Sequence, residues 1–63
     1  MYKELQVVKA KRLLSEKVPE GCLGTIVYVY SAKAYEIEFV NKEGVTLEVL
    51  TVEEKDIVLC LEE

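Results

Sequence analysis

The residues of this chain that could carry chemistry are a pair of carboxylates and two thiols. The sequence contains no histidine, so an enzyme would need paired carboxylates, a lysine or an activated cysteine. Glu36 and Glu38 alternate with apolar residues, which places both carboxylates on one face of a strand. They form a candidate acid–base pair. The same spacing is typical of the solvent face of an ordinary strand, and we favour this second interpretation.

The two cysteines give little support to covalent catalysis. Cys22 lies in a predicted loop beside Glu20, and a neighbouring carboxylate raises the pKa of a thiol, whereas a nucleophile needs a cation nearby. Cys60 alternates with Val58 and is expected to be a small packing residue. Two cysteines without histidine supply neither the usual zinc ligands nor a disulfide framework. We therefore predict a protein that is not an enzyme and has no metal or cofactor.

Length and composition predict one small folded domain that covers residues 1–63. Hydrophobic residues make up 51% of the chain and charged residues 32%, a balance typical of a folded domain rather than a disordered tail. A core in this size range supplies roughly 3–5 kcal/mol, so self-association is a natural source of extra stability. No apolar run resembles a signal peptide or a membrane span. We expect a cytoplasmic protein with reduced cysteines.

The charges are distributed unevenly along the chain. The formal net charge of −4 disfavours a nucleic-acid partner, because phosphates repel an acidic surface. Most basic residues nevertheless lie within residues 1–17, and Lys9, Lys11, Arg12 and Lys17 are the candidate nucleic-acid contacts. An alternative is that these charges protect an edge strand from aggregation.

Short runs of β-branched and aromatic residues predict five strands, over residues 5–10, 23–30, 35–39, 46–51 and 57–61. Gly21 and Gly24 indicate a tight loop that leads into the second strand, and Gly44 indicates a hairpin turn with positive φ. The run 51–54 has the form of a capping box before one helical turn. Five strands with a single 3-10 or helical turn before the last are the plan of a small all-β, SH3-like barrel.

The alternation within the strands predicts which residues face the core. Tyr35, Ile37 and Phe39 are expected to point inward on the third strand, and Leu47 and Val49 on the fourth. The second strand is apolar on both faces, so one of its faces is expected to contact something outside the core.

The sequence resembles a small bacterial family known as domain of unknown function 4926. The resemblance rests on the runs Gly21–Val27 and Ala34–Val40, followed by residues 44–47 and 50–51, and it covers nearly the whole chain. Cys22 and Gln6 depart from the residues usual in that family. The resemblance implies an SH3-like barrel of unestablished function and brings no functional residues. A looser similarity links the Gly24 region to KOW domains and to the small subunit of nitrile hydratase.

An outer apolar stripe is the strongest candidate for a binding surface. Ile26, Tyr28 and Tyr30 on the second strand and Leu50 on the fourth are expected to form it, unless a bulge redirects Ile26. Tyrosine is favoured at interfaces because its ring is apolar and its hydroxyl is polar. We therefore expect a protein-interaction module that binds a protein partner or its own copy.

Two other interpretations remain open from the sequence. One is a nucleic-acid-binding module that uses the basic residues named above. The other is an accessory subunit or an antitoxin-like partner of a neighbouring protein. Nothing in the residues indicates a small-molecule substrate or a membrane.

Overall fold

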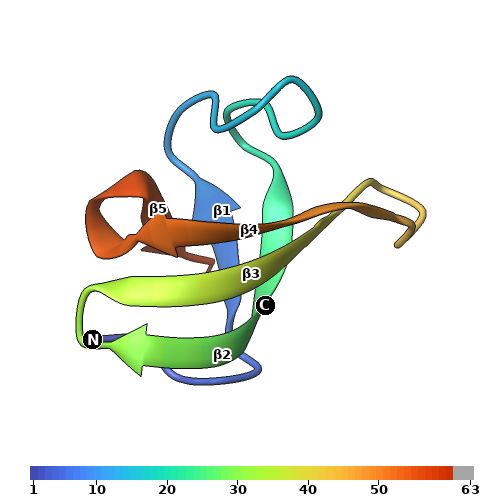
Figure 1. The fold of residues 1–63 in the computed structure, drawn as a ribbon. Coiled ribbons are helices and arrows are strands. Elements are labelled where there is room, and N and C mark those ends of the chain that lie inside the picture. The colour runs from blue at the N-terminus through green and yellow to red at the C-terminus, as the bar shows by residue number, and fades with distance from the viewer. Residues whose placement is uncertain (61–63) are drawn as a thin grey trace.

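The computed structural model describes residues 1–60, which form five antiparallel strands in one sheet (Figure 1). The strands are β1 (Val7–Ala10), β2 (Leu23–Ser31), β3 (Ala34–Val40), β4 (Thr46–Glu53) and β5 (Ile57–Leu59), and the sheet order is β4-β3-β2-β1-β5. A 3-10 turn, η1 (Glu54–Asp56), precedes β5. The predicted all-β fold with one turn before the last strand is confirmed. Position 61 of the predicted last strand lies outside the described residues.

Strand β2 bends and is shared by two ladders. Its first residues, Leu23 to Thr25, pair with β1, whereas pairing with β3 extends to Ser31. Figure 1 shows β2 running beside β1 and then turning to run beside β3. The register shifts between Ile26 and Tyr28, so Val27 is an extra residue at this bend. A bulge increases local bending, and here it lets the sheet curl around one core.

Gly21, before β2, and Gly24, within it, are required for different structural reasons. Gly21 adopts a φ of +90° in the loop, a conformation that favours glycine. Gly24 instead allows a close approach, because a Cβ there would lie 2.6 Å from Ile37 Cγ2 and 2.8 Å from Phe39 Cδ1. The predicted positive φ of Gly44 in the β3–β4 hairpin is confirmed at +84°.

The core lies on the concave side of the sheet. Tyr35, Ile37 and Phe39 of β3 are fully buried, as the alternation predicts. They pack with residues from every other strand and with Val18, which comes from the long connection between β1 and β2. Val18 stands next to Pro19 outside any strand, so no period-two pattern identifies it as a core residue.

The predicted orientation of β4 is wrong. Phe39 pairs with Glu48 and Val40 with Thr46, so Leu47 is a bulge that shifts the alternation of the strand. Leu50 and Val52 therefore face the core, opposite Ile37 and Tyr35, while Val49 is exposed. Glu48 shares the inward side but is half-buried, and its Oε1 accepts a hydrogen bond from Ser15 Oγ at 2.6 Å.

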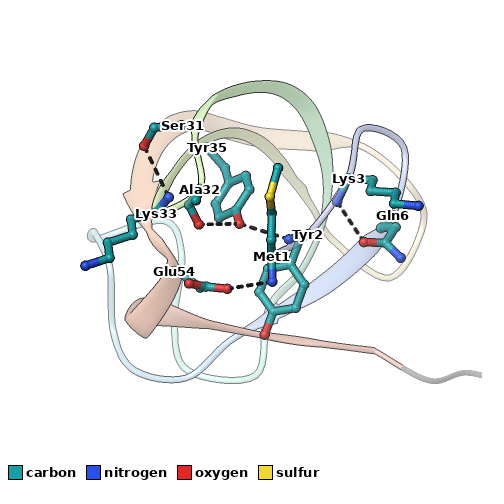
Figure 2. A network of polar contacts seen from close by, with 9 residues as sticks. All are labelled: Met1, Tyr2, Lys3, Gln6, Ser31, Ala32, Lys33, Tyr35 and Glu54. Atoms are coloured by element: carbon teal, nitrogen blue, oxygen red, sulfur yellow. Dashed lines mark hydrogen bonds and ion pairs between the residues drawn. The ribbon is translucent and has the colours of Figure 1, made fainter.

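A hydrogen-bond network around Tyr35 ties the N-terminal segment to the sheet (Figure 2). The Tyr35 hydroxyl accepts a hydrogen bond from the Tyr2 backbone N–H at 2.9 Å and donates one to the Ala32 carbonyl at 3.0 Å. The ring of Tyr2 also packs against that of Tyr35, with centroids 5.7 Å apart. The Met1 amino group forms an ion pair with Glu54 at 3.2 Å. Tyr35 is thus a core residue whose side-chain hydroxyl both accepts and donates a hydrogen bond.

The helical turn is capped differently from the prediction. Glu53 is its N-cap and exchanges capping-box contacts with Asp56, whereas Thr51 belongs to β4. Within residues 1–60, no helix has the length and hydropathy that crossing a bilayer requires.

Candidate functional site

The outward side of β2 presents Tyr28 and Tyr30, but not the whole predicted stripe. Tyr28 is 52% and Tyr30 55% exposed, as expected. Ile26, in contrast, is fully buried, so its assignment to the outer stripe is wrong. The cause is the extra residue Val27, which changes the alternation so that Ile26 and Val29 both point inward.

Leu50 is also misplaced in the predicted stripe. It lies opposite Ile37 and packs against the core as a half-buried residue. The bulge at Leu47 brings Val49 to the outer side in its place. The outward residues of β2, β3 and β4 that lie together on this side are hereafter called the tyrosine face: Tyr28, Tyr30, Glu36, Glu38, Val49 and Thr51.

Glu36 is the polar centre of the tyrosine face. It is half-buried and lies between Tyr28 on β2 and Thr51 on β4 in the ladders. Its Oε1 accepts hydrogen bonds from the Tyr30 hydroxyl at 3.0 Å and from Thr51 Oγ1 at 2.6 Å. Two donors on one oxygen hold the carboxylate in place. Its Oε2 has no hydrogen-bond partner among residues 1–60.

Glu38 provides a second carboxylate on the same side of β3. It pairs with Thr25 and Val49 in the ladders, and its Oε2 accepts a hydrogen bond from Thr46 Oγ1. The ion pairs formed within residues 1–60 involve other carboxylates, those of Glu53, Glu54 and Asp56. The tyrosine face therefore carries two negative charges that no cation of the described chain neutralises.

The two tyrosine rings form a fixed pair beside Glu36. Their centroids are 4.9 Å apart at an interplanar angle of 66°, an edge-to-face arrangement. The hydrogen bond to Glu36 is the main cause that raises the pKa of Tyr30, and the negative charge of that carboxylate adds to it. Tyr30 thus stays a neutral hydrogen-bond donor, and the face can hold a cation or a hydrogen-bond donor from outside.

A cleft of about 390 Å³ adjoins this surface at the other end of β3. Its apolar lining includes Leu23, Val40 and Leu47, and its rim includes Glu20 and Lys42. Val40 follows Glu38 by two residues and lies on the same outward side of β3. The cleft therefore begins two residues along β3 from the tyrosine face, on the same outward side of the strand.

The comparison with family models matches residues 4–59 to Domain of unknown function (DUF4926). The chain belongs to this family. Searches of curated proteins and of solved structures found no match. The resemblance on the runs around Gly24 and Ile37 is thereby confirmed at the level of the family. Because the function of DUF4926 is unknown, the functional argument rests on the site itself.

The structure describes both cysteines of this DUF4926 member. Cys22 and Cys60 both lie within the described residues and are not joined in a disulfide. Burial raises the pKa of the Cys22 thiol, so burial rather than Glu20 is the cause of the raised value. Its Sγ lies 3.5 Å from the Val40 carbonyl oxygen. A thiol with a raised pKa is a poor nucleophile. Within residues 1–60, no three His, Cys, Asp or Glu side chains are grouped as metal ligands.

The four candidate nucleic-acid contacts are spread over two segments of the DUF4926 domain. Lys9 is exposed on β1 between Leu23 and Val58, whereas Lys11, Arg12 and Lys17 lie on the connection between β1 and β2. The guanidinium of Arg12 already has one partner, because its Nε lies 3.0 Å from Oδ1 of the buried Asp56, while the Arg12 side chain is 62% exposed. Arg12 thus anchors the connection to η1.

Proposed function

We propose that this DUF4926 domain is a non-catalytic protein-interaction module that binds a protein partner through the tyrosine face. The observation that carries the proposal is the pair of tyrosines, which stand half-exposed and packed on each other on an open sheet face. Tyrosine rings supply large contact areas at a small entropic cost, and for this reason they are enriched at interfaces.

The fold itself makes little use of these two rings. The buried core is built from other residues, and the residue between the tyrosines, Val29, is the one that packs against it. Val27 and Val49 add exposed apolar area next to the rings. An open apolar area that folding does not use is the kind of surface that marks an interaction site.

The test removes both rings and keeps the fold. Tyr28→Ser with Tyr30→Ser is compared with a control that replaces two exposed apolar residues outside the tyrosine face, Leu13→Ser with Val45→Ser. The tagged proteins are used to capture partners from host lysate, and the affinity of the captured protein is then measured with purified components. Far-UV circular dichroism verifies that both variants are folded.

We expect the tyrosine variant to lose the partner, with a binding loss of at least tenfold, and the control variant to retain it. Retention of the partner by the tyrosine variant with unchanged affinity would contradict the proposal. Identification of both protein and nucleic acid in the captured material also separates this function from the basic-residue alternative.

A further inference from the structure

We infer that the tyrosine face binds cationic side chains, arginine or lysine, from an extended basic segment of a different protein. This inference rests on the proposed function and adds the chemistry of the partner. Glu36 is its central residue, with Glu38 as a second carboxylate and the rings of Tyr28 and Tyr30 beside it.

The first step is the state of the Glu36 carboxylate. Both of its donors, Tyr30 and Thr51, contact the same oxygen, Oε1. The side chain is therefore oriented before any ligand arrives. Its Oε2 accepts no hydrogen bond from residues 1–60 and can accept one from a ligand. A preformed acceptor loses little entropy on binding, and a charged donor such as guanidinium makes the stronger kind of hydrogen bond to it.

The second step is the position of the aromatic rings. Tyr28 lies directly opposite Glu36 in the β2–β3 ladder, so their Cβ atoms are about 5 Å apart. Tyr30 donates to Glu36 and packs edge-on against Tyr28. A cation that contacts Oε2 can thus meet an aromatic face as well, and cation–π attraction favours arginine in such settings.

The third step is the spacing along β3. Glu36 and Glu38 are two residues apart on one face, which corresponds to about 7 Å, and Val40 at the cleft follows after the same interval. An extended segment of a partner repeats its side chains at this same interval. We therefore infer a partner segment with cationic residues at positions i and i+2 and an apolar residue at position i+4. The cations face Glu36 and Glu38, and the apolar side chain lies in the cleft.

Charge decides between this partner and a second copy of the chain. A two-fold dimer through the tyrosine face would bring the same patch of both copies together, Glu36 and Glu38 against Glu36 and Glu38. Neither carboxylate has a cation from residues 1–60 to neutralise it. The same negative charge repels nucleic-acid phosphates. A basic protein segment is the occupant that complements this surface.

The test uses the capped peptide Arg-Thr-Arg-Thr-Leu and its reversed sequence, since the direction of the segment is not assumed. Binding to the full chain is followed by amide chemical shifts in NMR titrations at low salt. We expect shifts in β2 and β3 around Tyr28 and Glu36, and affinity that falls as salt is raised. A peptide with citrulline for arginine keeps the shape without the charge and is expected to bind at least fivefold more weakly.

Glu36→Gln removes the charge with little change in shape, and Glu16→Gln removes a charge from the exposed connection between β1 and β2. We expect roughly fivefold to tenfold weaker peptide binding for Glu36→Gln and unchanged binding for Glu16→Gln. Equal binding of the citrulline peptide, equal affinity of Glu36→Gln, or no binding of either arginine peptide would overturn the inference.

The captured partner separates this inference from the proposed function. A partner that is lost by the Tyr28→Ser/Tyr30→Ser variant but retained with full affinity by Glu36→Gln would overturn the cationic site and leave the interaction module intact. A partner retained by all variants would contradict the proposed function itself.

Discussion

The two sides of β3 differ in the burial and chemistry of their side chains. On the inward side Tyr35, Ile37 and Phe39 are fully buried, and on the outward side Glu36 and Glu38 are half-buried carboxylates without ion pairs in the described chain. The two sets alternate along residues 35–39, so the difference between them comes from the side of the sheet that each side chain faces. One strand thus serves stability with one side and, in our proposal, recognition with the other.

The hydroxyl groups of Tyr35 and Tyr30 show the same difference between the inward and outward sides. The Tyr35 hydroxyl both accepts and donates a hydrogen bond, and it lies in the core. The Tyr30 hydroxyl donates to Glu36 at the surface. Substitutions on the inward side should therefore change the free energy of unfolding, whereas substitutions on the outward side should change binding and titration.

The largest effect is expected for Phe39→Ala. Removing a fully buried phenylalanine costs about 3–5 kcal/mol, because transfer energy is lost and a cavity remains. This cost equals the roughly 3–5 kcal/mol that a core of this size supplies, so the variant is expected to be largely unfolded at 25 °C. Far-UV circular dichroism with urea titration measures it.

Glu38→Ala is the matched change on the outward side of the same strand, and it should leave a cooperative urea transition near that of the wild type. A folded Phe39→Ala variant, or an unfolded Glu38→Ala variant, would contradict the division between the two sides.

Period-two alternation predicts the division on β3 but not on its neighbours. Tyr35, Ile37 and Phe39 follow an uninterrupted alternation, and their burial follows from the sequence. Ile26 and Leu50 do not, because extra residues at Val27 and Leu47 shift the pattern in β2 and β4. Both strands are rich in apolar residues on both sides, so either phase satisfies the hydrophobic pattern and the sequence alone does not locate the bulges.

Part of the site was within reach of sequence reasoning. Equal spacing from the turn after Ser31 would pair Tyr28 with Ile37, so the observed pairing of Tyr28 with Glu36 depends on the register shift between Val29 and Ser31. The shared outward side of Glu36 and Glu38 was predictable from alternation alone. The convergence of Tyr30 and Thr51 on one oxygen of Glu36 was not, because it depends on the second shift in β2 between Val29 and Ser31 and on side-chain conformation. The contact of Arg12 with Asp56 joins residues 44 apart and has no local signal.

A smaller effect is expected for Tyr35→Phe. The substitution keeps the buried ring but removes the hydroxyl that joins the Tyr2 N–H to the Ala32 carbonyl (Figure 2). A buried group left without its partner costs about 1–3 kcal/mol, and the partial exposure of Tyr2 places the loss at the lower end. Urea unfolding measures the loss.

Tyr30→Phe removes the outward hydroxyl instead and is expected to leave the urea midpoint close to that of the wild type. Equal destabilisation by the two substitutions would show that the outward hydroxyl is as important to the fold as the buried one.

The smallest effect on folding, and the sharpest on the site, is expected from the titration of Tyr30. Its pKa is raised mainly because the neutral hydroxyl donates to Glu36, so the contact favours the protonated form in the folded state. Its contribution to stability is therefore complete below the pKa of an unfolded tyrosine and is lost as the pH rises through the folded value.

Glu36→Gln should move the pKa of Tyr30 down toward its ordinary value, while the Glu16→Gln control should not. Ultraviolet difference titration near the tyrosinate band, with Tyr28→Phe as the common background to reduce overlap, follows this shift. An unchanged Tyr30 pKa in Glu36→Gln would mean that the carboxylate is not held by the hydroxyl, and it would remove the preformed acceptor on which the recognition of a cation depends.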